Sequence, residues 1–250
     1  MKALALAALL TALALPASGS ARVMGSLALQ GELSMTSTPG ECPPNAPPEA
    51  SLCAARTGNG LVPGLGQVSE IYTFYVDETS CGDGLKVLAT TARLDVAGKG
   101  SIDLALARFP DCIPSALIVT RPFTVTGGSG IYAGASGSGS VASNAHYTTT
   151  GSAGDDTWSG TFAVPGLEFD LTPPALSGAV NKRAKARRGA RRARVTYKVT
   201  ATDAVDGSVA TSCKPRSGSR FKIGRTTVKC SATDSSGNTG SARFTVLVRR

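Results

Sequence analysis

Apolar and polar residues alternate in short runs between residues 26 and 164. A period of two residues predicts half-buried β-strands, because successive side chains of a strand point to opposite faces of a sheet. Clusters of Gly, Pro, Asp and Ser separate the runs, as turns separate strands, and no amphipathic helix is predicted after residue 21. Seven strands are expected, at residues 26–33, 70–76, 86–94, 100–106, 122–126, 139–147 and 157–164.

The pattern changes between Glu168 and Pro174, where Pro173 and Pro174 favour an extended chain, because a residue before proline avoids the helical region. A second β-rich segment follows at residues 195–248. We therefore predict a barrel-like domain at residues 22–168 and a smaller module at residues 169–250. The inward face of that module is expected to hold Phe221, Ile223, Val228, Phe244, Val246 and Val248.

The first 21 residues have the order of a secretory signal peptide. Met1-Lys2 is basic, Ala3 to Leu15 is apolar, and small residues follow to Ala21. The apolar run is shorter than the roughly 20 residues that span a bilayer, and no other stretch predicts a transmembrane segment. We expect a secreted or envelope-associated protein, in keeping with exported bacterial proteins. The sequence leaves its oligomeric state open.

The composition limits the chemistry. The chain has 29 Gly and 14 Pro, which suits many turns and argues against a helical bundle. A single His excludes a His-rich metal site and most Ser-His-Asp arrangements. We expect no enzyme activity, and we assign no catalytic residue, metal ligand or cofactor.

The six cysteines fit an oxidising compartment, because an even number permits complete pairing. Six cysteines allow fifteen pairings. The separation of the two modules favours Cys213–Cys230, and pairing of sequence neighbours favours Cys81–Cys112 and Cys42–Cys53. No C-x-x-C motif suggests a metal instead.

The order of strands, cysteines and turns in the second module is distinctive. It runs through Val195 to Gly207, Cys213 to Ser219, Phe221 to Gly224 and Thr226 to Asn238. This segment resembles the hyalin repeat (HYR) domain. The resemblance implies an immunoglobulin-like sandwich associated with extracellular adhesion.

Four polar residues of this module permit two interpretations. Asp203, Asp206, Asp234 and Asn238 are candidate oxygen ligands for calcium, which some extracellular modules bind. The other interpretation is that the same residues form Asx turns at strand ends. No D-x-D-x-D-G run is present, so the sequence favours turns.

The module departs from the HYR pattern in one strongly basic segment. Residues 182–194 hold eight basic residues and no acid, and they supply +8 of the formal net charge of +9. A patch of this kind suits anionic cell-surface polymers or glycans, whereas the alternative is a solvated loop. No aromatic residues interleave for base stacking, so nucleic acid is not expected. The candidate anion-binding residues are Lys182, Arg183, Lys185, Arg187, Arg188, Arg191, Arg192 and Arg194.

A glycine-rich hairpin at residues 123–139 resembles that of allene oxide cyclase and dirigent-like barrels. The resemblance implies an eight-stranded antiparallel barrel, but no site residue of those families maps onto this chain. Gly128 to Ala133 matches a dinucleotide fingerprint, yet more Gly and Ser follow where a helix is needed. His146 is expected at the surface or in the lumen, and Trp158 in the core or at the rim.

Three functions remain open from the sequence. An all-β chain with an antiparallel barrel-like domain followed by an immunoglobulin-like sandwich favours an exported, non-enzymatic binding or adhesion protein. The alternatives are a small-molecule- or lipid-binding barrel, which includes a cyclase-like enzyme, and a structural envelope spacer.

Overall fold

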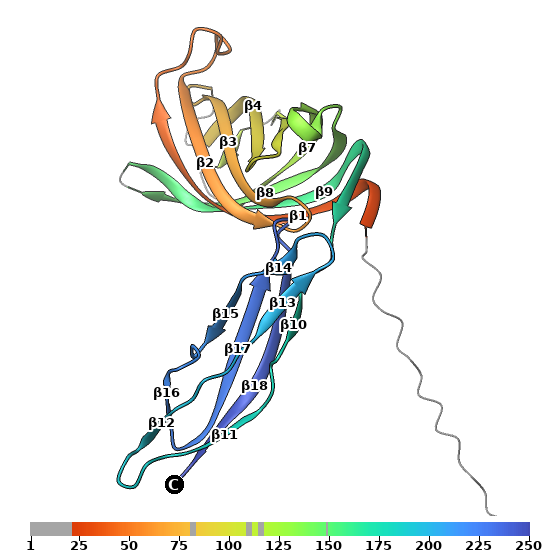
Figure 1. Cartoon of the computed structure of the whole chain (residues 1–250). Coiled ribbons are helices and arrows are strands. Elements are labelled where there is room, and N and C mark those ends of the chain that lie inside the picture. The colour runs from red at the N-terminus through yellow and green to blue at the C-terminus, as the bar shows by residue number, and fades with distance from the viewer. Residues whose placement is uncertain (1–21, 81–83, 109–111, 115–117, 149) are drawn as a thin grey trace, which may run out of the picture.

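The computed structural model describes residues 22–80, 84–108, 112–114, 118–148 and 150–250 (Figure 1). The predicted signal peptide, residues 1–21, lies outside the described residues. The described chain is all β apart from one short 3-10 helix, η1 (Gly130–Tyr132). No described helix has the length and apolarity to cross a membrane.

Strands β1 to β9 form one sheet that closes on itself, because β3 pairs with both β2 and β4. The order β3-β2-β1-β9-β8-β7-β5-β4 makes an eight-stranded antiparallel barrel, with β6 added to one end of β4. The strands are β1 (Arg22–Gly40), β2 (Leu52–Val62), β3 (Gly66–Asp77), β4 (Gly84–Val96), β5 (Gly100–Leu106), β6 (Ile113–Pro114), β7 (Ile118–Gly128), β8 (Ser136–Thr148) and β9 (Gly151–Asp170).

All seven predicted strands lie within strands of this barrel, and β5 matches its predicted bounds. The eighth strand, β2, has no prediction from the alternation. Its inward positions include Gly58 and Gly60, where large apolar residues are normal. A Cβ at Gly60 would stand 2.5 Å from Leu33 Cδ2, so the glycine makes room for a neighbour's side chain. The small residue at this inward position of β2 is therefore required by the packing of the barrel.

Large apolar side chains fill the barrel core. Trp158, Tyr72 and Phe162 are at most 1% exposed, and Phe123 packs against Trp158 with ring centroids 5.3 Å apart. Burial of so many large side chains is the main stabilising contribution to such a fold. Trp158 is therefore a core residue.

The C-terminal module packs small sheets around a second core. Phe221, Val228, Phe244, Val246 and Val248 are buried there, and Ile223 packs against them, which confirms the predicted inward face. One sheet has the order β10-β13-β14, one β11-β18-β17-β15, and one β12-β16. The strands are β10 (Ala175–Ser177), β11 (Lys182–Lys185), β12 (Arg192–Arg194), β13 (Thr200–Asp203), β14 (Gly207–Val209), β15 (Thr211–Lys214), β16 (Arg220–Lys222), β17 (Gly224–Thr233) and β18 (Thr239–Arg249).

The basic segment is not simply a loop, which corrects the expectation from the sequence. β11 pairs parallel to β18, and β12 pairs antiparallel to β16. Ala184, Ala186 and Ala193 pack on the second core, so the basic residues between them point outward. Alternation of Ala with Arg or Lys is thus a strand pattern with a small inward residue.

Disulfides join Cys42 to Cys53 and Cys213 to Cys230, as predicted. The first closes the proline-rich connection between β1 and β2, residues 41–51, and β1 extends to Gly40, beyond the strand predicted at residues 26–33. The predicted Cys81–Cys112 bridge involves Cys81, which lies outside the described residues.

The barrel and the C-terminal module meet end to end (Figure 1). The Gly64 amide donates to the Ser236 carbonyl over 2.7 Å, and the Lys99 ammonium donates to the Leu65 and Ser235 carbonyls. The Asn238 side-chain amide donates to the Asp170 carbonyl over 2.9 Å. Hydrogen bonds thus connect the two parts at this junction.

Candidate functional site

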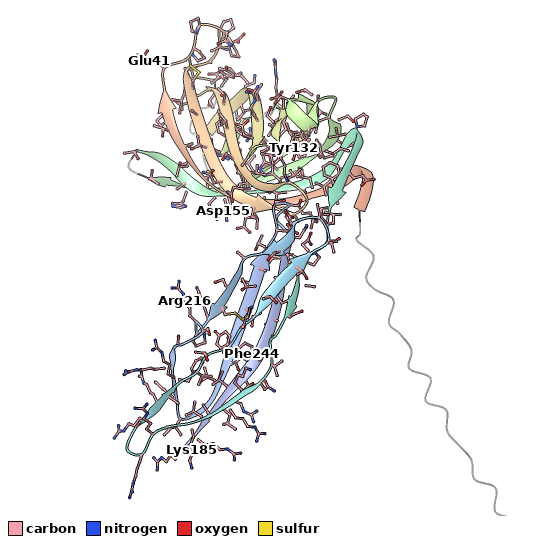
Figure 2. All side chains as sticks on the ribbon, in the orientation of Figure 1. Glu41, Tyr132, Asp155, Lys185, Arg216 and Phe244 are labelled. Atoms are coloured by element: carbon pink, nitrogen blue, oxygen red, sulfur yellow. A yellow bond between two sulfur atoms is a disulfide. The ribbon has the colours of Figure 1, made fainter. Side chains whose placement is uncertain are left out.

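The eight basic residues of segment 182–194 gather at the end of the C-terminal module that is distant from the barrel. Figure 2 shows Lys185 at this end, and Glu41 at the far end of the barrel. Seven of these side chains are exposed and Lys182 is partly exposed. We call this set the basic tip; it comprises Lys182, Arg183, Lys185, Arg187, Arg188, Arg191, Arg192 and Arg194.

Backbone pairing holds the basic tip in place. The Ala186 amide donates to the Arg249 carbonyl over 2.8 Å, and the Ile223 amide donates to the Arg191 carbonyl over 3.2 Å. Between them, a turn is closed by the Ala190 amide and the Arg187 carbonyl. The segment therefore has fixed anchor points on β16 to β18 and presents its side chains in a defined arrangement.

Like charges face each other across the strands of the tip. Arg192 lies opposite Lys222, and Arg194 lies opposite Arg220 in the β12–β16 pair. In the β11–β18 pair, Lys185 lies beside Arg249. Opposed like charges destabilise a sheet, so these pairs are not explained by stability.

Two surface hollows, of about 810 and 730 Å³, lie at the basic tip. Neither has an Asp or Glu in its lining. The first hollow is lined by residues of three segments, at 185–187, 190–194 and 218–220, and each segment contributes at least one arginine. The basic side chains that line one or both are Lys185, Arg187, Arg188, Arg191, Arg192, Arg194, Arg220 and Arg250.

The formal charge is divided unequally along the molecule. Residues 171–250 contain 18 Lys and Arg and only 3 Asp, which gives a net charge of +15. Residues 22–170 contain 7 Lys and Arg and 14 Asp and Glu, which gives −7. The modest total of +9 therefore hides two parts of opposite sign.

A buried ion network lies inside the barrel, at positions that the sequence did not single out. Arg56 Nη1 on β2 contacts both carboxylate oxygens of Asp156 on β9 at 2.8 Å, and it also donates to Ser143 Oγ. Asp156 is fully buried and Arg56 is 6% exposed. A pair of buried charges costs desolvation, so its geometry has to be good to offset that cost.

Glu70 on β3 extends the network. Trp158 Nε1 donates to Glu70 Oε2 over 3.0 Å, while Glu70 Oε1 is buried without a hydrogen-bond partner. Burial, together with the nearby charge of Asp156, raises the pKa of Glu70 to about 8, although the hydrogen bond from Trp158 and the charge of Arg56 act in the opposite direction. The Glu70 carboxyl is therefore favoured in its protonated form at neutral pH.

A second arginine, Arg121 on β7, enters the same interior and is 2% exposed. Its guanidinium lies 4.7 Å from the centre of the Tyr72 ring, and the Arg56 guanidinium lies 4.7 Å from that of Phe74. Both contacts are cation–π interactions, which are stronger when desolvated. Burial, together with the charge of Arg56, lowers the pKa of Arg121 to about 9.

The alternation within each strand contained the signal for this network. Glu70 falls in phase with Val68 and Tyr72, which both point into the barrel, whereas Ile71 between them is exposed. Likewise Asp156 is in phase with Trp158 on β9. A charged residue at an inward position of a strand predicts a buried charge. The prediction of the strands considered only their apolar residues and therefore missed this signal.

Four carboxylates come together at the junction of the barrel with the C-terminal module. Asp170 ends β9, Asp203 ends β13, Asp206 lies in the turn before β14, and Asp234 follows β17. One oxygen of each lies within 4.8 Å of the others. Asp203, Asp206 and Asp234 are all the acidic residues of segment 171–250. Burial raises the pKa of Asp234.

Asx turns do form here, as the sequence suggested. Asp203 Oδ1 accepts from the amides of Val205 and Asp206, and Asp234 Oδ1 accepts from the amides of Ser236 and Asn238. These turns use one oxygen of each carboxylate. Asp234 Oδ2 accepts from the Asn238 side-chain amide, which also donates to the Asp170 carbonyl, whereas Asp203 Oδ2 is buried without a hydrogen-bond partner.

The remaining candidates lie apart from these groups. His146 is exposed on β8. The fingerprint-like segment Gly128 to Ala133 contains the three-residue helix η1 and is followed by strand β8 instead of an α-helix, so the phosphate-binding geometry is missing there.

Residues 169–248 match the model of the HYR domain family. This match supports the resemblance read from the sequence, and it associates the C-terminal module with cell adhesion. Together with the disulfides, it fits an extracellular protein. No curated protein matches the chain, and no solved structure matches it. The likeness of the hairpin to allene oxide cyclases and dirigent-like barrels therefore remains a hypothesis.

Proposed function

We propose that this chain is an exported, non-enzymatic binding protein that attaches to anionic cell-surface polymers or glycans through its basic tip. The single observation that carries this proposal is the set of like-charge pairs at the tip, Arg192 with Lys222, Arg194 with Arg220 and Lys185 with Arg249. Such pairs repel in the free protein, and a polyanion placed among them relieves the repulsion.

The electrostatics of the whole chain support an oriented attachment. The C-terminal segment has a formal charge of +15 and the barrel segment one of −7. A negative surface attracts the first and repels the second, so the field turns the tip towards the surface. The barrel is then presented away from it, at the opposite end of the molecule (Figure 1).

The chemistry of the tip favours a flexible polyanion over a nucleic acid. Arginines dominate, and their planar guanidinium groups suit sulfate, phosphate and carboxylate oxygens. No aromatic residue lies within segment 182–194, so base stacking is not provided. A cell-surface glycan or wall polymer with repeated anionic groups fits this surface, and adhesion agrees with the HYR match.

The test is attachment of the purified protein to the washed surface of the producing cell. In the tip variant, Arg187, Arg188, Arg191 and Arg192 are replaced by Ser; all four are exposed. In the matched control, Lys214, Arg216, Lys229 and Arg243 are replaced, which removes the same charge from exposed positions outside the tip. We expect the tip variant to lose attachment and the control to keep most of it. Equal attachment of the two variants would refute the proposal.

Small-molecule binding inside the barrel is a second candidate, supported by one observation. Three buried polar atoms in the barrel have no hydrogen-bond partner: Glu70 Oε1, Tyr72 Oη and Arg56 Nε. A polar ligand would provide the missing partners. Against it, Trp158 and Tyr72 already fill this level of the barrel. Native mass spectrometry of the purified protein tests this candidate, because a bound ligand adds a defined mass to the protein. The fraction of protein that carries this added mass should fall in Glu70→Gln.

A further inference from the structure

We propose that the four carboxylates at the junction bind one calcium ion that links the barrel to the C-terminal module. The site comprises Asp170, Asp203, Asp206 and Asp234. The proposal concerns a different end of the module from the basic tip and does not depend on polyanion binding.

The spacing fits a calcium ion. One oxygen from each carboxylate lies within 4.8 Å of the others. Oxygens bound to one Ca²⁺ at about 2.3–2.6 Å stand at most about 5 Å apart, whereas those around Mg²⁺ stand at most about 4 Å apart. An all-oxygen ligand set from three turns and a strand end also suits the flexible coordination of calcium better than the strict octahedron of magnesium.

The hydrogen bonds leave one oxygen of Asp170 and one of Asp203 without a partner, whereas Asp234 Oδ2 accepts from the Asn238 side-chain amide and Asp206 Oδ2 from the Ser235 amide. Asp170 Oδ1 accepts from the Thr172 amide over 2.9 Å, and Asp203 Oδ1 accepts from two backbone amides of its own turn. Asp170 Oδ2 and Asp203 Oδ2 are shielded from solvent and have no hydrogen-bond partner. Asp170 is 93% buried, with a relative exposure of 7%. A buried carboxylate oxygen without a partner is rare, and a bound cation would provide the missing partner.

Among the residues that the structure describes, no Lys or Arg forms an ion pair with the four carboxylates. Within the described residues, the ion pairs are Arg56–Asp156 and Arg93–Asp103, and none involves the junction. Lys99 lies at the junction, but its ammonium donates to the carbonyls of Leu65 and Ser235. Residues 171–250 contain 18 Lys and Arg but only three acidic residues, and all three lie next to Asp170. Four carboxylates so close together without a counter-charge favour a bound cation.

The ligands come from both sides of the junction. Asp170 is the last residue of the barrel strand β9, and the other three belong to turns of the C-terminal module. A shared ion would therefore join the two parts next to the Gly64–Ser236 hydrogen bond. Calcium would fix the angle between the barrel and the module, while its removal would let the junction bend.

Isothermal titration of CaCl₂ into the calcium-stripped full chain tests the site. We expect one saturable site with a Kd of about 10⁻⁴–10⁻³ M, the range of extracellular modules, and at least tenfold weaker binding of MgCl₂. Asp203→Asn and Asp170→Asn keep the Oδ1 acceptor of each turn and should weaken calcium binding at least tenfold. Glu41→Gln, at an exposed carboxylate at the other end of the barrel, should bind like the unchanged chain.

Small-angle X-ray scattering provides the second readout, with a narrower distribution of particle dimensions in calcium than in EDTA. If Asp170→Asn fails to fold, as judged by circular dichroism, Asp206→Asn at an exposed residue replaces it. Three results would overturn the proposal: no saturable heat up to about 10 mM calcium, ten times the weak end of the range; equal affinity for magnesium; or unchanged binding in the Asp203 and Asp206 variants.

Discussion

Trp158 Nε1 donates a hydrogen bond to Glu70 Oε2 over 3.0 Å inside the barrel, between strands β9 and β3. Trp158 is the single tryptophan of the chain. Its fluorescence therefore reports on the buried ion network without labelling. The contact also places the titration of Glu70 beside the only indole in the protein.

We expect Trp158 emission to change with a midpoint near pH 8, because burial raises the pKa of Glu70 to about 8 from an ordinary value of 4.5. Between these values the folded chain holds a proton that the unfolded chain has lost. The free energy of unfolding should therefore fall as pH rises through this window, by at most about 1.4 kcal/mol per pH unit.

Glu70→Gln is the matched control for this titration, because its amide oxygen still accepts the indole hydrogen bond. The variant should show neither the emission change nor the fall in stability that urea unfolding at pH 5 and pH 8 measures. An emission titration that persists in Glu70→Gln would assign it to another group.

Removal of Asp156 should destabilise the barrel strongly. Asp156→Ala leaves Arg56 charged, 6% exposed and without its carboxylate partner, and loss of one partner of a buried pair costs about 3–5 kcal/mol. Asp103→Ala is the control, since the Arg93–Asp103 pair is exposed and such pairs contribute less than about 1 kcal/mol. Urea unfolding followed by Trp158 emission measures both. Similar losses for the two variants would contradict the network described here.

Gly66 should be needed for close approach at the junction. Its φ is +100°, and a Cβ would stand 2.4 Å from the Ser235 carbonyl oxygen. Gly66→Ala should therefore push the two parts away from each other and speed amide exchange at Gly64, which donates to Ser236. At Gly98 the φ is +71° and no atom lies within 4 Å, so Gly98→Ala adds backbone strain without a clash. Faster exchange at Gly64 in both variants, or in neither, would argue against a tight junction.

The strands were predictable wherever an inward position held a large apolar residue. The run at residues 100–106 coincides with β5, because Ile102, Leu104 and Leu106 all point inward. β2 escaped the same criterion because Gly58 and Gly60 occupy its inward positions. The strands of the basic segment were not predicted because their inward residues are alanines, which are too small to give a clear alternation of large apolar and polar residues.

The sites were less predictable, for reasons of distance along the chain. Arg56 and Asp156 are 100 residues apart and meet only because β2 and β9 flank β1 in the closed barrel. Asp170 joins the junction carboxylates through the end of a barrel strand, so a search for a continuous calcium loop cannot find it. The basic tip is local in sequence and was therefore visible, although its like-charge partners on β16 and β18 were not.

Affinity for heparin at different salt concentrations tests the central claim most directly, because exposed charges are screened by salt. Between about 0.1 M and 1 M NaCl the Debye length falls from about 10 Å to 3 Å. We predict tight binding of the unchanged chain at the lower concentration, its loss at the higher one, and no binding to neutral dextran. The variant with Ser at Arg187, Arg188, Arg191 and Arg192 should lose most of this affinity, while the control at Lys214, Arg216, Lys229 and Arg243 retains it. Salt-independent binding, or an equal loss in both variants, would contradict the account.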